Sequence, residues 1–301
     1  MTEPLKAAVL GDRKIVAVSG TDRVKFLQGL TTNDIRRLAP DKAVYTGFLT
    51  GQGKLICDAF VFQDGDRILV DVAATFVEDF VKRLRAFRLR AAVEIGETAP
   101  ALAVAVVWGT EAAARMDLET MEGLTGKGAI VEAQFAFVDP RIADLGARLV
   151  YSADFPIEAE LARVGFAMVT AADYTGHRLA LGIADTSEIG GEVCYPLEAN
   201  FEMLHGIDFK KGCYIGQELT ARMKHKIELR KRILPVSGPT TLPTAGTPVT
   251  ADGTALGPLI SASSTRGLAL LRIDRLADVK NDSIRAGDVP LIIHWPSWLP
   301  R

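Results

Sequence analysis

The sequence predicts a protein of mixed strands and helices with a β-rich domain at its C-terminal end. Apolar segments flank a polar, Gly-rich turn over residues 45–62, which is typical of a β-hairpin. Apolar residues at three- and four-residue steps over 75–90 predict an amphipathic helix. Residues 239–258 are rich in Pro, Thr and Gly, with short strand patterns on either side. This shift in composition separates a β-domain, 232–301, from a core, 1–231.

The core contains further predicted elements along the chain. Alternation of apolar and polar residues over 14–19 predicts a strand, and Thr21 or Asp22 offers an N-cap for the helix that follows. Further strands are predicted over 67–72, 102–107 and 142–150, helices over 111–122 and 155–168, a turn from Ala171 and a loop over 190–201.

Composition and charge exclude several classes of protein. The chain has 48% hydrophobic and 24% charged residues, and its net charge of −2 gives no overall attraction for nucleic acid. The N-terminus shows no secretory leader pattern, and no window approaches the roughly 20 apolar residues of a membrane span. Three widely spaced cysteines, Cys57, Cys194 and Cys213, argue against a disulfide framework. We therefore expect a cytoplasmic protein without membrane contact.

The segment 206–232 carries the densest chemical pattern. Two glycines bracket Cys213, so the backbone there can turn tightly or approach a ligand closely. Two lysines precede the thiol, and a nearby cation favours the reactive thiolate form. Residues 205–232 contain eight Lys and Arg against three acids, which gives a local charge of +5. The bracketing residues are Lys210, Lys211, Gly212 and Gly216.

Two plainer interpretations of this segment stay open. A single cysteine is more often a small buried apolar residue than a reactive group, and a run of charges is usually a solvated surface. The coincidence of thiol, glycines and cations favours function, so we expect Cys213 to be the functional thiol. Cys57 and Cys194 are expected to be structural. The separated cysteines and four scattered histidines predict no resident metal or cluster.

Several motifs resemble those of one family. The octapeptide Lys211-Gly212-Cys213-Tyr214-Ile215-Gly216-Gln217-Glu218, followed by Arg222, resembles the signature of the YgfZ-type folate-binding proteins in the glycine-cleavage aminomethyltransferase superfamily. Segments 26–34 (FLQGLTTND), 49–58 (LTGQGKLICD) and 196–201 (PLEANF) resemble other motifs of this superfamily, in the same order. Mitochondrial relatives of these proteins act late in iron–sulfur cluster assembly.

The resemblance implies an α+β fold of the aminomethyltransferase type. Three subdomains would form a ring around a central folate channel, with two intertwined α+β subdomains in residues 1–231 and a β-barrel in 232–301. The implied cofactor is tetrahydrofolate or a derivative, which needs a carboxylate for the pterin, apolar walls for the ring and cations for the glutamate tail. The implied binding residues are Glu198, Arg178, Lys211, Arg222, Asn33, Gln52 and Asp58. A structural loop acid remains the alternative for Glu198, and a turn or strand-edge hydrogen bond for Asp58.

Three functions are consistent with these patterns. The first is a folate-binding accessory factor that assembles or repairs iron–sulfur enzymes through Cys213, with assembly proteins or client enzymes as partners. The second is a folate-dependent aminomethyltransferase or other one-carbon transferase. The enzymes of this superfamily carry Gly-Tyr-Thr-Gly-Glu, whereas here Tyr174-Thr175-Gly176 continues with His177, which disfavours this chemistry and leaves enzymatic activity open. The third is a weak tRNA contact through the basic stretch 222–232, in keeping with tRNA modification.

Overall fold

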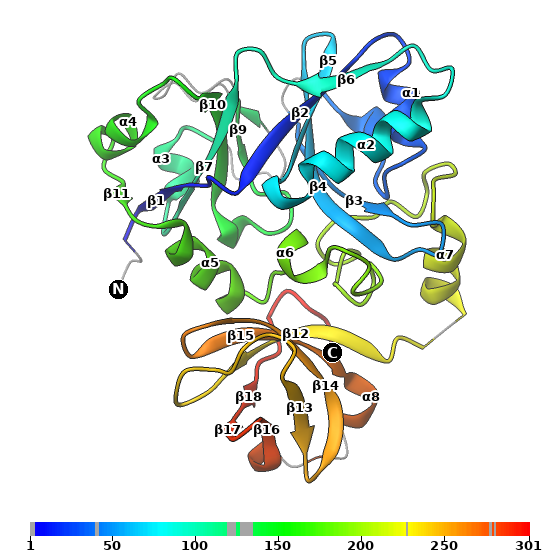
Figure 1. The fold of residues 1–301 in the computed structure, drawn as a ribbon. Helices are drawn as coiled ribbons and strands as arrows, with labels where there is room; N and C mark the ends of the chain where they lie inside the picture. Colours follow the sequence, from blue (N-terminus) through cyan, green and yellow to red (C-terminus); the bar gives the residue numbers. More distant parts are fainter. Residues whose placement is uncertain are drawn as a thin grey trace.

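The computed structural model of the chain describes residues 4–39, 42–118, 125–126, 135–226, 228–276, 279 and 281–301. Three β-sheets with their covering helices make up the fold (Figure 1). Two sheets lie side by side in the upper part of the figure, and the C-terminal sheet lies beneath them. This mixture of sheets and separate helices confirms the predicted α+β class.

The first unit is a five-stranded antiparallel sheet covered on one face by short helices. Its elements are β2 (Arg13–Ser19), α1 (Arg23–Gln28), η1 (Ile35–Arg37), β3 (Val44–Leu49), β4 (Leu55–Asp64), β5 (Arg67–Ala73), η2 (Ala74–Phe76), α2 (Val77–Arg88) and β6 (Glu94–Glu97). The strand order is β3-β4-β5-β2-β6. Strands β3 and β4 are the predicted hairpin, and α2 is the predicted amphipathic helix. Phe80 and Leu84 of α2 pack against the strands, as the apolar spacing requires.

The second unit is a six-stranded sheet with helices on its outer face. Its elements are β1 (Lys6–Val9), β7 (Leu102–Trp108), α3 (Ala112–Arg115), β8 (Thr125–Gly126), β9 (Phe135–Val138), η3 (Ala143–Leu145), β10 (Ala147–Ser152), α4 (Ile157–Arg163) and β11 (Ala167–Met168). The strand order is β11-β1-β7-β10-β9-β8, with only the β1–β11 pair parallel among the described residues. Ile157 and Leu161 of α4 join the outer core of this sheet.

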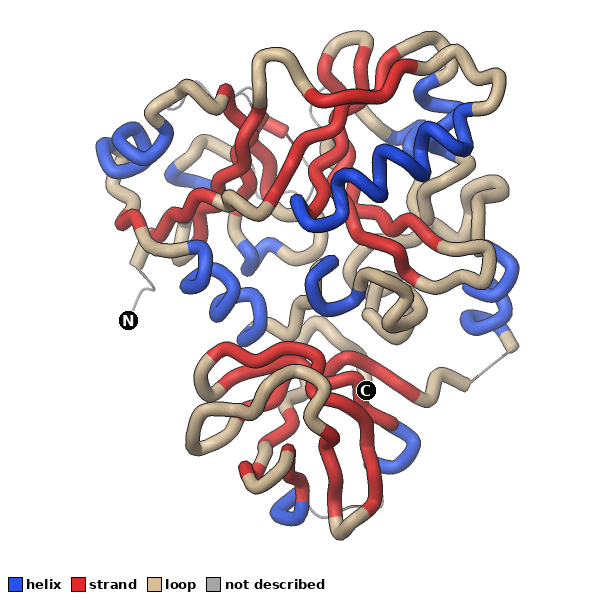
Figure 2. Tube along the Cα trace, in the orientation of Figure 1, coloured by secondary structure: helices blue, strands red, loops and turns tan. Residues whose placement is uncertain are grey.

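The third unit is a nearly closed seven-stranded barrel, as predicted. Its elements are β12 (Lys231–Ser237), β13 (Pro248–Ala251), β14 (Thr254–Ser263), β15 (Arg266–Arg272), α8 (Ile273–Leu276), η4 (Asn281–Ser283), β16 (Ile284–Ala286), β17 (Val289–Pro290) and β18 (Ile292–Ile293). The strand order is β17-β16-β13-β14-β15-β12-β18. Three helices occupy the chain between the second sheet and the barrel, and Figure 2 shows them as separate short segments: α5 (Ala171–Ala180), α6 (Thr186–Ile189) and α7 (Gln217–His225).

The side-chain alternation of the strands sends alternate residues into two different cores. On β4, Cys57, Ala59 and Val61 pack toward the core that contains α2. Phe60 and Phe62 point the other way, into a central core shared by all three units. Because side chains alternate along a strand, Asp58 belongs to this inner face as well. The inner faces of the two upper sheets therefore meet at a core that carries charged residues.

Four local predictions differ from the structure. The predicted turn at Ala171 is the first residue of helix α5, because Thr170 and Asp173 form a reciprocal capping box. The helix predicted over 155–168 ends at Arg163, and Gly165, whose φ of +100° lies in the left-handed region, separates it from β11. The strand predicted from residue 142 starts at Ala147, after a 3₁₀ turn. Of the helix predicted over 111–122, residues 111–118 are described, and only Ala112–Arg115 form a helix, α3; residues 119–122 lie outside the described residues.

Gly216 joins the segment before α7 to the β3–β4 hairpin turn. It precedes α7 with a φ of +82°, in the left-handed region that favours glycine. A Cβ at this position would lie 2.6 Å from the Thr50 carbonyl oxygen and 2.9 Å from Leu49 Cβ. Gly212, in contrast, would place a Cβ in open space. Only one of the two glycines that bracket Cys213 is therefore required by packing.

We predict that Gly216→Ala lowers the free energy of unfolding by about 2–4 kcal/mol, because it adds backbone strain to a steric clash. The matched control Gly212→Ala should change it by less than about 0.5 kcal/mol. Urea unfolding followed by circular dichroism measures both values. Equal stability of the two variants would show that the contact with Thr50 is not needed.

Candidate functional site

The segment 206–216, hereafter the motif loop, is anchored to the end of α1 by a buried lysine. The Lys211 ammonium donates to the carbonyl oxygens of Gln28 at 2.9 Å and Asn33 at 2.8 Å, and also to that of Thr31. It lies 4.9 Å from the centre of the Tyr214 ring. Burial lowers the pKa of Lys211 to about 8, although the charges of nearby carboxylates act to raise it. This lysine therefore fixes the loop from within.

Cys213 is exposed on this anchored loop, whereas the other two cysteines are buried. Burial raises the pKa of both Cys57 and Cys194. All three cysteines are free thiols. Between the lysine anchor at 211 and the glycine contact at 216, the exposed thiol has a defined place on the surface. The motif thus presents one accessible sulfur.

A pocket of about 510 Å³, hereafter the polar pocket, opens beside the motif loop. It combines two aromatic residues with three cations and two carboxylates. Asn33 is held in its wall by hydrogen bonds from its amide nitrogen to the carbonyl oxygens of Tyr45 at 2.9 Å and His205 at 2.6 Å. The other polar and aromatic lining residues are Arg37, Lys42, Glu202, Asp208, Phe209 and Lys210.

An ion network, hereafter the inner network, joins the inner faces of the two upper sheets. Asp71 of β5 accepts hydrogen bonds from Arg13 of β2 at 2.7 Å and from Arg148 of β10 at 2.8 Å. Arg141 pairs with Asp139 through two contacts of 2.9 and 2.7 Å. All five side chains are buried. Asp71 therefore bridges an arginine of its own sheet and one of the opposite sheet.

The ring of Phe60 lies among the guanidinium groups of this network. The Arg148 guanidinium carbon is 4.0 Å from the ring centre, and that of Arg141 is 4.9 Å away. Burial alone would raise the pKa of the Asp139 carboxyl, but the charges of Arg141 and Arg148 and the hydrogen bonds from Arg141 hold it below its ordinary value. The Asp139 carboxyl is therefore ionised at neutral pH.

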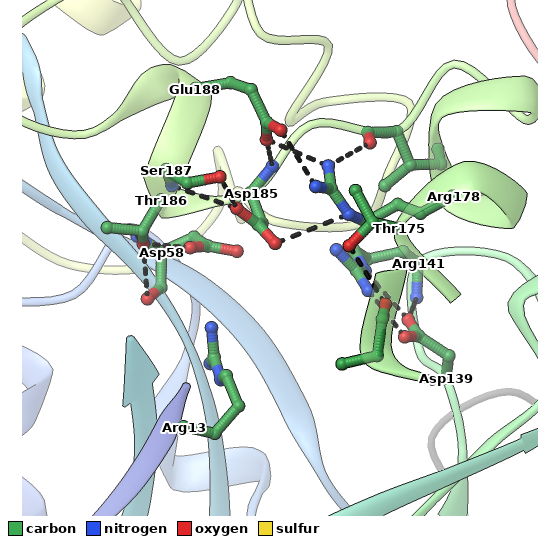
Figure 3. Close-up of polar contacts among 12 residues, drawn as sticks. Arg13, Asp58, Asp139, Arg141, Thr175, Arg178, Asp185, Thr186, Ser187 and Glu188 are labelled. Atoms are coloured by element: carbon green, nitrogen blue, oxygen red, sulfur yellow. Dashed lines mark hydrogen bonds and ion pairs between the residues drawn. The ribbon is translucent and has the colours of Figure 1, made fainter. Parts of the chain in front are cut away.

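A second charged group lies beside the inner network (Figure 3). Arg178 of α5 forms two hydrogen bonds with Glu188 of α6, at 2.9 and 2.8 Å, and lies 3.4 Å from Asp185. Asp58 of β4 accepts a hydrogen bond from the Thr186 hydroxyl. Its second carboxylate oxygen is buried without a hydrogen-bond partner among the described residues. Asp58 is thus the buried carboxylate with spare acceptor capacity at the centre of the fold.

The binding residues predicted from the sequence lie in different parts of the structure. Asn33 lines the polar pocket, while Asp58 and Arg178 lie in the centre of the fold. Glu198 lies in a different pocket near α7, where it accepts a hydrogen bond from the Tyr195 backbone nitrogen. Gln52 and Arg222 are exposed on the surface. Lys211 lies in the motif loop, where its ammonium group is already occupied by backbone carbonyl oxygens.

Sequence reasoning missed the inner network and most of the polar pocket. A single Asp inside the apolar run ILVDVA of β5 is a signal for a buried charge, and so is Arg148 inside β10. The Asp139-Pro-Arg141 segment gave no signal of this kind. The pocket residues come from segments far apart in the sequence, 33–45, Pro140 and 202–210, so nothing in their spacing reveals that they converge.

The polar pocket fits the chemistry of a folate better than the dispersed set does. Its volume is in the range of small-molecule sites. Phe209 offers a flat apolar surface, and the Asp208 carboxylate lies near it, paired with Arg37 at 2.9 Å. Lys42 and Lys210 are the cations available for a glutamate tail. At the position of the enzymes' Glu, His177 lies 2.8 Å from the Asp144 carbonyl oxygen, so no carboxylate is present there.

Comparison with known proteins first defines the class of the fold. Residues 13–151 match the family described as the GCVT N-terminal domain, and residues 230–301 match the CAF17 C-terminal beta-barrel domain. The fold is similar to that of the glycine cleavage system aminomethyltransferase T from Bartonella henselae, with a TM-score of 0.77 over 98% of this chain and 86% of that chain, at 14% identity. The predicted aminomethyltransferase fold is thereby confirmed.

Two fungal relatives then define the family. The mitochondrial iron–sulfur cluster assembly factor IBA57 homolog of Aspergillus fumigatus is 32% identical over 321 residues, which cover 90% of this chain and 71% of the relative. That of Mycosarcoma maydis is 35% identical over 248 residues, or 77% of this chain. The chain spans only 57% of the length of the latter. The chain belongs to this family of iron–sulfur cluster assembly factors.

These relatives contradict the expected cytoplasmic location, because both are named as mitochondrial proteins. The expectation was wrong because unpaired cysteines indicate a reducing compartment without specifying which one. In the described part of the chain, no helix has the length and apolar character that a membrane crossing requires. Among the same residues, no three His, Cys, Asp or Glu side chains gather in a group that could hold a metal ion.

We predict that Asp71→Asn lowers the free energy of unfolding by about 3–5 kcal/mol, because it leaves the buried Arg13 without its ion-pair partner and Arg148 with only its longer contact to Asp139, at 3.6 Å. The control is Asp274→Ala, which removes a surface ion pair with Arg272 and should leave stability nearly unchanged. Denaturant unfolding of both variants gives the comparison. A fully stable Asp71→Asn variant would contradict the bridging role of this carboxylate.

Proposed function

We propose that the chain is an accessory factor for the assembly or repair of iron–sulfur enzymes, that it acts through Cys213, and that it binds a folate in the polar pocket. The observation that carries the proposal is the single exposed thiol on a loop fixed by Lys211 and Gly216. Membership of the assembly-factor family supports the same role. The cluster is cargo in this proposal, passed to or from a partner protein.

One thiol can supply one ligand to a cluster. A [4Fe–4S] or [2Fe–2S] cluster is normally held by four protein ligands, so the remaining ligands come from the partner. Cys57 and Cys194 are buried and cannot complete a surface site. The role proposed for Cys213 is therefore a shared or transient ligand during transfer.

The polar pocket would hold the folate next to this loop. Lys210 lies in the pocket wall and in the motif loop at once, three residues before Cys213. In the proposed arrangement, Phe209 contacts the ring, Asn33 and Asp208 bind its polar edge, and Lys42 and Lys210 bind the glutamate tail. A bound tetrahydrofolate would supply a carrier for one-carbon units and an oxidisable pterin.

A second function, folate-dependent one-carbon transfer, has one observation in its favour. Asp58 is a buried carboxylate with an unpartnered oxygen at the centre of the fold, where a general base could act. An assay for methylene-tetrahydrofolate formed from an aminomethyl donor tests it. Turnover that is lost in Asp58→Asn would make this the primary function. Absence of turnover in the wild-type protein removes it.

We predict that Cys213→Ala reduces the activity of a [4Fe–4S] dehydratase in cells to the level of a deletion strain. The reason is that the substitution removes the exposed sulfur while the buried anchors of the loop remain. The neighbouring Gly212→Ala serves as control and should retain wild-type activity, since its added methyl group meets open space. Immunoblotting verifies equal protein levels. Normal dehydratase activity in Cys213→Ala, with loss in the deletion strain, would exclude a thiol-dependent role.

We predict that the double variant Lys42→Glu/Lys210→Glu binds pentaglutamyl tetrahydrofolate about tenfold more weakly than the wild type, because it reverses two charges at the tail site. Anaerobic calorimetric titration measures the affinity. Arg222→Glu and Glu198→Gln lie outside the polar pocket and should bind as the wild type does. A larger loss in these two variants would place the folate in another site.

A further inference from the structure

A pocket of about 240 Å³, hereafter the junction pocket, lies where α5 meets the barrel. Figure 1 shows α5 above β15, and β12 is the neighbour of β15 in the barrel sheet. The lining residues come from α5, from these two strands and from the segment after β18; they are Ala180, Pro235, Ser237, Arg266 and His294. None of them lines the polar pocket or belongs to the motif loop. The junction pocket is therefore separate from the site proposed above.

Strand alternation and register bring a serine and an arginine together in this pocket. On β12, Leu234 and Val236 point into the core of the barrel, whereas Ile233 points into the central core. Ser237 continues the face of Ile233, because side chains alternate along a strand. Arg266 of β15 is its directly opposite partner in the sheet. Opposite residues project from the same face with their Cβ atoms about 5 Å apart, so the hydroxyl and the guanidinium group begin side by side.

His294 is in direct contact with this serine. Its ring nitrogen Nε2 lies 2.7 Å from the Ser237 Oγ atom, and either atom can be the donor. The backbone nitrogen of His294 donates to the Pro235 carbonyl oxygen at 2.9 Å, so the chain is held beside β12 without the help of the ring. When Nε2–H donates to Oγ, the hydroxyl proton of Ser237 is free to point at a ligand. The histidine can therefore set the serine as a donor.

The junction pocket has positive charge that nothing in the described chain neutralises. The guanidinium group of Arg266 is exposed and has no ion pair or hydrogen bond with another described residue. No carboxylate lines the pocket. A permanent cation, an imidazole and a hydroxyl donor without an acid among them favour an anionic ligand.

We propose that the junction pocket binds a phosphate group, carried by a small molecule or present as the free ion. The guanidinium fork of Arg266 can donate to two oxygens of one anion, and the Ser237 hydroxyl to a third. A phosphate has at least three acceptor oxygens, whereas the fork alone already uses both oxygens of a carboxylate. His294 is a positioning residue here, because its Nε2–H orients the hydroxyl of Ser237.

The size of the pocket limits what can accompany the phosphate. Its volume of about 240 Å³ is smaller than the roughly 300–1,000 Å³ of sites for drug-sized ligands. A phosphate with a short substituent fits this space, and a whole folate needs more. The proposal is independent of the accessory role, since no step of it involves Cys213 or the polar pocket.

The probes are inorganic phosphate and methyl phosphate, titrated against the full chain at pH 8 and constant ionic strength. Phosphorus NMR measures the dissociation constants. We expect the wild type to bind at least one probe, and Arg266→Ala to bind it about tenfold more weakly or worse. Arg266→Lys should also bind more weakly than the wild type, because lysine retains the charge without the fork. Tighter binding of methyl phosphate assigns an esterified phosphate, and tighter binding of inorganic phosphate assigns the free ion.

A double-mutant cycle tests the positioning role of the histidine. Ser237→Ala and His294→Ala should each weaken binding about threefold or more. In the Ser237→Ala background, His294→Ala should cost less than it does alone, because the hydroxyl that it orients is already absent. Equal costs in both backgrounds would contradict the positioning role. These side chains are exposed or half-buried, so the midpoint of thermal unfolding without ligand should stay within about 2 °C of the wild type.

Two control variants separate the junction pocket from other cationic surfaces. Arg285→Ala removes an exposed arginine elsewhere on the barrel, and Lys42→Glu/Lys210→Glu reverses the charge of the polar pocket. Both should bind the phosphate probes as the wild type does. Loss of binding in the polar-pocket variant with normal binding in Arg266→Ala would overturn the proposal. Absence of binding to either probe at about 10 mM, or equal binding of acetate, would overturn it as well.

Discussion

The buried carboxylate of Asp71 is the constraint on which the centre of this fold depends. It lies between an arginine of its own sheet and an arginine of the opposite sheet, with no access to water. Buried charges are costly unless they are paired with good geometry, so the two sheets can approach each other in very few ways. Strand alternation then determines which residues face inward. Phe60 and Asp58 share the inner face of β4 for this reason, and the guanidinium groups of Arg141 and Arg148 lie over the Phe60 ring.

The motif loop is built differently, from backbone acceptors and a close backbone approach. Lys211 gathers three carbonyl groups at the end of α1, and Gly216 touches the hairpin turn. Both interactions hold the chain on either side of Cys213 without involving its sulfur. The thiol is thus exposed on a rigid frame, a combination that suits exchange with a partner. The polar pocket lies beside the same loop.

Local patterns were sufficient to predict much of the fold. The hairpin, helix α2 and the strands of the barrel follow from periodicity and turn residues that lie within a few positions of each other. Helix α5 was missed because its apolar spacing is weak and its start depends on the capping pair Thr170 and Asp173. The motif around Cys213 was recognisable from its resemblance to a family. The acceptors of Lys211, however, come from residues 28–33, and no spacing rule connects these with position 211.

The candidate binding residues likewise could be chosen by residue type, but their positions in space could not be predicted from the sequence. Asn33 lines the polar pocket as one of its fixed walls, whereas Arg222 and Gln52 are exposed elsewhere. Their residue types suit a folate, but type alone does not bring side chains together. Convergence depends on the contact between the motif loop and the end of α1. That contact is a property of the tertiary fold.

The separation in sequence between Lys211 and its acceptors has a consequence for the order of folding. The contact with Thr31 spans 180 residues, so it forms only after distant parts of the core have met. Contacts of such long range are characteristically late, because loop closure must precede them. A nascent or partly unfolded chain therefore lacks the frame around Cys213. The fixed position of the Cys213 thiol is therefore reached only when the whole core has folded.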